Sequence, residues 1–185
     1  MTRAVAVLSF AAAIAVSAAL AAPAPARPEE AQHLPRPFTA EQIRDEWVEG
    51  LTLVMRSVGP QGEARQRWTV LESNDAGVLI EFAPIDAKGE AAGAARTERS
   101  TWTQLRDHAT FSASSATRDA VTRKTPLGTF EGWLYVVPDP EQGTVTEFFF
   151  ANDLPGAPLE MRVSREGRTL MELTQVSRSK TKTKR

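Results

Sequence analysis

Cysteine is absent from the whole 185-residue chain. The absence excludes disulfides, cysteine-ligated zinc, thiol nucleophiles and a lipid anchor on an N-terminal cysteine. A small export-bound protein without cysteines is more typical of a bacterial envelope than of a eukaryotic secretory route. Histidine is also scarce, with only His33 and His108 in the chain.

Sequence motifs of the common enzyme classes are missing as well. The chain has no glycine-rich phosphate loop after a strand, no HExxH and no Gly-x-Ser-x-Gly. These absences weigh against nucleotide enzymes, zinc proteases and α/β-hydrolases. No segment repeats with a period of about 20 to 50 residues, which excludes solenoids and propellers. We therefore expect no catalytic residues, no metal site and no cofactor.

The N-terminus indicates export. Arg3 precedes an uncharged, alanine-rich run from Ala4 to Ala22, and Ala19-Leu20-Ala21 fits the small-x-small rule of signal peptidase. We predict a cleavable signal peptide over residues 1–22 rather than a membrane anchor, because the run is short and prolines follow it. The mature protein would have no transmembrane span and would be periplasmic or secreted.

Composition divides the rest of the chain into three parts. Residues 23–37 are rich in Pro, Ala and Glu and predict a disordered linker. Residues 38–177 have the size of one domain with one core. Residues 178–185 form a basic tail that we expect to be disordered.

Charge is uneven between body and tail. Removing Arg3 and five basic tail residues from the 22 Lys and Arg leaves 16, against 23 Asp and Glu, a net charge of about −7. Such a body has no general affinity for nucleic acid. The tail Arg178–Arg185 is either a solubilising end or a weak contact to an anionic surface.

Two short helices are indicated by repeated capping boxes. Thr39 is followed three positions later by Gln42, and Thr101 by Gln104. In this pattern each side chain satisfies an otherwise free backbone N–H group. We predict one N-terminal helix of about ten residues that ends at Gly50, and one short inserted helix from residue 101 to about 109.

Alternating apolar residues separated by turn residues indicate strands elsewhere. Val78, Ile80 and Phe82 alternate with Leu79 and Glu81, which indicates a strand with a mostly buried side. Leu159, Met161 and Val163 alternate with charged neighbours. About eight strands at hairpin spacing predict a mainly β fold, a single curved antiparallel meander sheet or half-open barrel. The predicted strands are shorter than the roughly ten residues of an outer-membrane barrel, and Arg and Glu fall on both strand faces, so such a barrel is not expected.

Aromatic residues are the candidates for a ligand site. Phe148, Phe149 and Phe150 load both faces of one strand, which then needs cover on two sides. Two short helices supply only one cover, so an open cavity between sheet and helix is a reasonable expectation, with a packed core as the alternative. The candidate ligand-binding residues are Trp68, Trp102, Leu105, Trp133, Phe148 and Phe150.

Two other features invite a chemical interpretation. His108 follows Asp107 near the end of the second helix, but no serine elbow or carboxylate cluster accompanies it. A structural histidine at a helix C-terminus is the favoured interpretation. Asn152 and Asp153 open the string NDLPGAP, and two oxygen side chains are too few for calcium, so we expect a turn there.

The C-terminal third resembles a known family. The runs TPLGTFEGWLYVV, TEFFFANDLPGAPLEMRV and GRTLMELTQV in residues 125–177 are similar to the ending of DUF3108-like exported bacterial proteins of unknown function. Gly156 departs from the plainer Leu-Pro corner of that pattern. The resemblance implies a half-barrel, lipoprotein-carrier-like fold and no particular activity.

These observations favour a non-enzymatic envelope protein that binds an apolar ligand, a lipid chain or a hydrophobic peptide, on its curved sheet. The first alternative is an envelope scaffold that acts through protein–protein contacts. The second alternative is a hydrolase that uses His108 with an acid such as Asp107 or Asp153.

Overall fold

A computed structural model of the chain describes residues 32–181. The predicted signal peptide 1–22, most of the predicted linker and the end of the basic tail lie outside the described residues. Within residues 32–181 the chain forms two helices and nine strands. They are α1 (Ala40–Glu46), β1 (Leu51–Gly59), β2 (Gly62–Asn74), β3 (Gly77–Ile85), β4 (Arg96–Ser100), α2 (Trp102–Asp107), β5 (Thr117–Thr125), β6 (Gly128–Asp139), β7 (Thr144–Ala151), β8 (Glu160–Arg165) and β9 (Arg168–Lys180).

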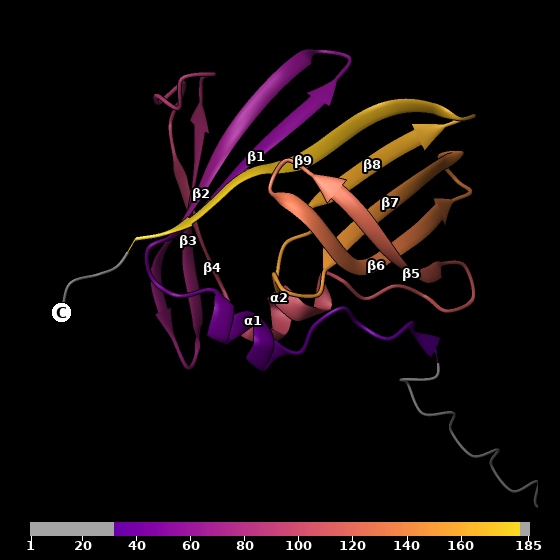
Figure 1. The fold of residues 1–185 in the computed structure, drawn as a ribbon, viewed down its shortest axis with the longest axis horizontal. Coiled ribbons are helices and arrows are strands. Elements are labelled where there is room, and N and C mark those ends of the chain that lie inside the picture. The colour runs from indigo at the N-terminus through magenta and orange to yellow at the C-terminus, as the bar shows by residue number, and fades with distance from the viewer. Residues whose placement is uncertain (1–31, 182–185) are drawn as a thin grey trace, which may run out of the picture.

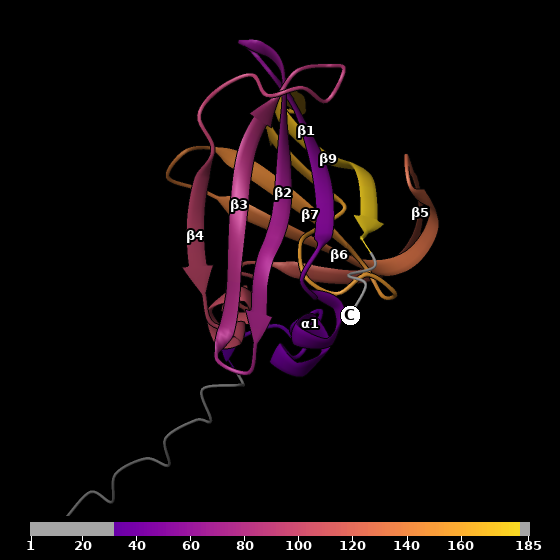
Figure 2. The same cartoon turned by 90° about the vertical axis from the view of Figure 1, so that its left-hand side faces the viewer.

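The strands make one antiparallel sheet in the order β4-β3-β2-β1-β9-β8-β7-β6-β5. Within the described residues β4 and β5 do not pair, so the sheet is curved but not closed (Figure 1). Figure 2 shows that β1 to β4 run upright while β6 and β7 cross behind them, a result of the twist that adjacent strands accumulate. The predicted mainly β, half-open fold is confirmed.

The two helices begin where the sequence predicts. Thr39 and Thr101 are the N-caps, and each forms a complete capping box with the glutamine three residues later. Both helices are short, with 7 and 6 residues, and both lie under the hollow of the sheet (Figure 1). Helices of this length are marginal in isolation, so their burial against the sheet must stabilise them.

The main core lies between the helices and the concave face of the sheet. Ile43 and Trp102 are the buried residues of α1 and α2. They join apolar residues of the strands in one cluster, which includes Leu53, Ile80 and Tyr135. The alternation in β3 and β6 places these side chains on one face, as the period-2 pattern requires.

A second, smaller core occupies the opposite face of β7. Phe149 is fully buried there with Leu159, and Val121 of β5 and Phe130 of β6 pack against them. Strands β5 and β6 therefore curl back over this face. Gly132 permits the curl, because a Cβ at this position would collide with the backbone of Phe150.

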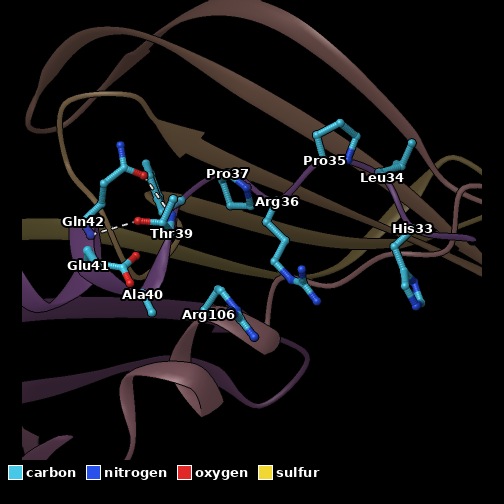
Figure 3. Close-up of a pocket in the computed structure, with 11 residues that line it drawn as sticks. His33, Leu34, Pro35, Arg36, Pro37, Thr39, Ala40, Glu41, Gln42 and Arg106 are labelled. Carbon is cyan, nitrogen blue, oxygen red and sulfur yellow. Dashed lines mark hydrogen bonds between the residues drawn. The ribbon is translucent and has the colours of Figure 1, made fainter. Parts of the chain in front are cut away.

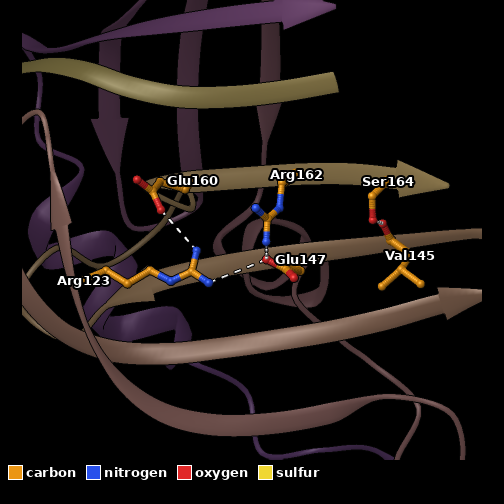
Figure 4. Close-up of polar contacts among 6 residues, drawn as sticks. All are labelled: Arg123, Val145, Glu147, Glu160, Arg162 and Ser164. Atoms are coloured by element: carbon orange, nitrogen blue, oxygen red, sulfur yellow. Dashed lines mark hydrogen bonds and ion pairs between the residues drawn. The ribbon is translucent and has the colours of Figure 1, made fainter. Parts of the chain in front are cut away.

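An ion network closes the rim of this second core (Figure 4). Arg123 of β5 lies 3.2 Å from Glu160 of β8 and 3.6 Å from Glu147 of β7, and Arg162 also pairs with Glu147. The guanidinium of Arg123 also lies 5.7 Å from the ring centre of Phe149. The network thus ties the curled edge strand to the middle of the sheet.

The ordered body begins before Phe38. His33 forms a β-bridge with Ser112, and the N–H of Leu34 donates to the carbonyl of Phe111. The hydroxyl of Tyr135 donates to the carbonyl of Pro35 at 2.6 Å. Burial raises the pKa of this tyrosine, despite the opposing effect of Arg118, so the phenol remains a donor. Residues 32–37, within the predicted linker, therefore form a strap along the domain.

The body also continues past Ser177. Arg178 and Lys180, within the predicted basic tail, are part of β9 and pair with β1. Both side chains bind Glu46 at the end of α1, at 2.7 and 2.8 Å. These ion pairs explain the ordered position of residues that composition alone assigns to a tail. Neither helix within residues 32–181 is long and apolar enough to cross a membrane.

Candidate functional site

A cavity of about 200 Å³ lies between the concave face of the sheet and the two helices. Its walls come from α1, β2, α2 with the segment that follows it, β7, and the loop before β8. The lining residues are Ile43, Trp47, Trp68, Leu105, His108, Ala109, Phe111, Phe148, Phe150, Gly156, Ala157 and Pro158. Apart from His108 these are apolar or aromatic residues, so the cavity presents a hydrophobic surface.

The loop NDLPGAP forms one wall by holding Trp47. The indole N–H of Trp47 donates to the carbonyl of Pro155 at 2.9 Å. Gly156 has φ +118°, and a Cβ there would collide with the same indole. Only glycine adopts this conformation and also permits this approach. Gly156 is therefore required by the packing of Trp47.

The sheet supplies the opposite wall. Trp68 on β2 donates its indole N–H to Gln66 at 2.7 Å. The ring of Phe148 lies tilted against that of Phe111 with centroids 5.2 Å apart, and Phe150 packs edge-on against Phe38 with centroids 6.1 Å apart. Because both cavity tryptophans use their N–H groups on protein oxygens, they offer a ligand only their apolar surfaces.

Four of the six predicted ligand-binding residues meet at this cavity. They are Trp68, Leu105, Phe148 and Phe150. Trp102 does not line it, because its ring is 6% exposed in the core and its N–H donates to the carbonyl of Asn74. Trp133 lines a different, shallow hollow of β5 and β6, with the guanidinium of Arg118 3.3 Å from the centre of its ring.

Eight of the twelve lining residues were not among the predicted site residues, and Trp47 and Gly156 are the two of these that build the wall at the NDLPGAP loop. The helical spacing of Trp47 from Ile43 predicts a shared face, which is correct, but it does not distinguish a cavity wall from core. The signal at Gly156 was its place in the proline-rich string NDLPGAP, which predicts a turn but not a contact with Trp47.

His108 and Asp107 do not form a catalytic pair. The Asp107 carboxylate binds Arg106 at 2.8 Å and Arg36 at 3.4 Å. The hydrogen bond from Arg106 lowers the pKa of Asp107, and burial opposes this effect without outweighing it. Within residues 32–181 no hydrogen bond joins Asp107 to His108, so the geometry of a carboxylate-oriented base is missing in the described structure.

A second, wider hollow of about 780 Å³ lies along the strap and the start of α1 (Figure 3). Most of its polar groups are already engaged: Thr39 and Gln42 bond each other's backbone, and Arg36 and Arg106 bind Asp107, while Nδ1 of His33 is buried without a partner. The hollow therefore lacks a set of free groups that converge on one point. We place the candidate site in the smaller apolar cavity.

Metal ligation finds no support in the described residues. No group of three or more His, Asp or Glu side chains is close enough within residues 32–181 to hold an ion. At the start of NDLPGAP the N–H of Asn152 donates to Glu131, and the N–H of Leu154 donates to Ala151 and closes a turn.

Comparisons with known proteins show a similar fold. The crystal structure of MucB in complex with MucA(peri) matches with a TM-score of 0.51 and 13% identity, over 77% of this chain and 53% of that chain. The Pseudomonas aeruginosa MucA/MucB complex matches with a TM-score of 0.50 and 14% identity, over 75% and 54%. A Bacteroides fragilis protein with a YmcC-like fold matches at 0.44 and 11% identity, over 71% and 96%.

At these identities the similarity is one of fold alone, and this chain spans about half the length of the MucB chains that it matches. No protein-family model matches the chain, and neither does any curated protein. The DUF3108-like resemblance therefore stays a prediction, while the half-open fold that it implies is the fold observed.

Proposed function

We propose that this chain is an exported, non-enzymatic protein of the bacterial envelope that binds an apolar group of its ligand in the cavity between sheet and helices. One observation carries the proposal. Residues from five separate segments converge on a hydrophobic cavity, and the indole N–H groups of its two tryptophans are bonded to protein oxygens. Small-molecule sites are typically concave and mostly apolar in this way.

The size of the cavity limits what it holds. Ligand pockets for drug-sized molecules are about 300–1,000 Å³, while an apolar cavity of about 150 Å³ is enough to bind benzene. A cavity of about 200 Å³ fits a short alkyl segment or one aromatic ring. Only part of a lipid chain, or one side chain of a hydrophobic peptide, would enter it.

Export is supported by the sequence of residues 1–22, with Arg3 before an uncharged run and a small-x-small site at Ala19–Ala21. Expression of the full chain in a bacterium with a periplasm tests this part. We expect the soluble periplasmic fraction to contain a form that begins near residue 22 by mass spectrometry. A full-length, membrane-bound form would contradict export by a cleaved signal.

Binding is tested with an environment-sensitive apolar dye. We expect saturable fluorescence enhancement that a lipid displaces. Ala157→Trp should abolish the enhancement by filling the cavity, whereas Ala92→Trp, at an exposed position far along the chain, should preserve it. Both variants must unfold cooperatively, as the parent does. Equal dye binding by Ala157→Trp and the parent would exclude the cavity as the site.

The second candidate is an envelope scaffold, and the observation in its favour is that MucB, which shares the fold, is solved in complex with MucA. Such contacts would use the free edges of β4 and β5 or the basic end of the chain. Deletion of residues 182–185 tests the end without removing Arg178 and Lys180 from Glu46. Unchanged vesicle binding and unchanged envelope-protein capture at low salt would exclude a role for those residues.

A further inference from the structure

The cavity has one polar side chain in its wall. Within residues 32–181, His108 is the only titratable residue that lines it. His108 is the C-cap of α2, where its backbone N–H donates to the carbonyl of Gln104. The residue is exposed, whereas its neighbour Ala109 is buried. His108 therefore lies where the apolar cavity meets solvent.

The imidazole of His108 is not used by the fold. No hydrogen bond or ion pair of its side chain occurs in the described part of the chain, and the adjacent Asp107 is bound by Arg106 and Arg36. The other polar atoms of cavity side chains, the indole N–H groups of Trp47 and Trp68, are bonded to protein oxygens. His108 is thus the side chain that remains to meet a polar group of a ligand.

The carboxylate that acts on His108 is that of its neighbour Asp107, and it is held by other groups. On α2 and the strap, Asp107 is balanced by two arginines. On α1, the carboxylate of Glu41 accepts a hydrogen bond from the first turn of its own helix, and Arg44 pairs with Asp45. Among the described residues that line the cavity, the imidazole of His108 is therefore the one side-chain donor that is not already bonded to the protein.

We infer that the ligand is a small amphiphile with one carboxylate, whose apolar body occupies the cavity and whose carboxylate accepts a hydrogen bond from His108. The inference rests on the proposed apolar binding and specifies the chemical class of ligand. Imidazole donates to carboxylate in a charge-assisted hydrogen bond, which is stronger than a neutral one. In this role His108 determines specificity and takes part in no reaction.

The test compares two probes of equal chain length, octanoate and 1-octanol, as competitors of the apolar dye on the full mature protein. We expect octanoate to bind about threefold to tenfold more tightly than 1-octanol, a modest factor because the histidine is exposed. His108→Gln should remove the preference, and His108→Arg should retain it through a fixed cation. Binding of 1-octanol should be the same in all three proteins.

His33 provides the matched control, because it is the other histidine of the chain and lines the strap hollow instead of the apolar cavity. His33→Gln should leave the octanoate preference unchanged. An equal preference in the parent and in His108→Gln would overturn the inference while leaving the apolar site intact. Failure of both probes to displace the dye, or a dye that does not bind, would instead count against the proposed function.

Discussion

The two faces of β7 are covered by different means. On one face, Phe149 is fully buried against Leu159 and the curled strands β5 and β6. On the other face, Phe148 and Phe150 meet two short helices and the loop that contains Gly156, and a cavity of about 200 Å³ remains. Three consecutive phenylalanines thus contribute to a closed core and to an open site.

The difference follows from what covers each face. A strand of the same sheet follows the curvature of its neighbours and packs at close distance, and here an ion network fixes it further. Helices of 7 and 6 residues have few side chains to fill a strongly curved hollow. The sheet therefore supplies stability on one side and space for a ligand on the other.

The largest effect should come from the closed face. Phe149→Ala should lower the free energy of unfolding by about 3 to 5 kcal/mol, because it opens a cavity in a packed cluster. Phe148→Ala should cost at least about 1 kcal/mol less, since Phe148 is only partly buried beside an existing cavity. Urea unfolding measures both changes in the free energy of unfolding. Equal losses of stability would contradict the proposed difference between the two faces of β7.

Next in size is the loop that forms the cavity wall. Gly156→Ala should lower the free energy of unfolding by about 2 to 3 kcal/mol, because the φ of +118° disfavours any side chain and the indole of Trp47 occupies its place. The matched control is Gly167→Ala, where φ is +75° and nothing lies within 4 Å, with an expected cost of about 1 kcal/mol. Dye affinity should fall only in the first variant, since only there the cavity wall moves.

The junction of α1 with β9 should give the third effect. Burial raises the pKa of Glu46, but hydrogen bonds from Lys180 and Arg178 outweigh it and the pKa is lowered overall. Its contribution to stability is therefore full above the pKa of an unfolded glutamate and is lost as pH falls through the lower folded value. Glu46→Gln should cost about 2 kcal/mol at neutral pH, because it leaves the 8%-exposed Arg178 without its carboxylate.

The control for this junction is Glu98→Gln, which removes an exposed pair with Arg96 and should change stability by less than about 0.5 kcal/mol. Unfolding curves at neutral and acidic pH should converge for the parent and Glu46→Gln as the parent carboxylate becomes protonated. Parallel losses at every pH would show that Glu46 acts by packing rather than by charge.

The smallest effect should come from the rim of the closed face. Arg123→Gln should cost about 1 kcal/mol, and the difference from the parent should shrink in high salt. Lys124→Gln, at the exposed neighbouring position, should have no comparable effect. Neither variant should change dye affinity, because the network lies on the face opposite the cavity; a weaker affinity for Arg123→Gln would mean that the two faces are coupled.

Local sequence patterns predict much of this fold. The capping boxes place both helices, alternation places most strands, and the phenylalanine run predicts that β7 is covered on both faces. Strand β5 escapes such reasoning, because its half-buried side chains include Arg118, which stacks on Trp133, and Arg123, which pairs with two glutamates. In the sequence, a polar residue that has a partner in the folded protein cannot be distinguished from a polar residue of a loop.

The limits of the domain could not be predicted for a related reason. Residues 32–37 have the composition of a linker, yet the carbonyl of Pro35 accepts a hydrogen bond from Tyr135, about 100 positions away. Residues 178–180 have the composition of a tail, yet Glu46 on α1 binds two of them. Similarly, nothing local distinguishes Trp68, which lines the cavity, from Trp102, which is in the core.

The four tryptophans allow the most direct test of the proposed cavity site. Incorporation of 5-fluorotryptophan should give four ¹⁹F resonances, and single Trp→Phe variants assign them. 1-Octanol is then titrated into the labelled protein. We expect the resonances of Trp47 and Trp68, which line the cavity, to shift with a common saturating curve, while those of Trp102 and Trp133 stay in place. Saturable shifts of Trp102 or Trp133 without shifts of Trp47 and Trp68 would contradict the account.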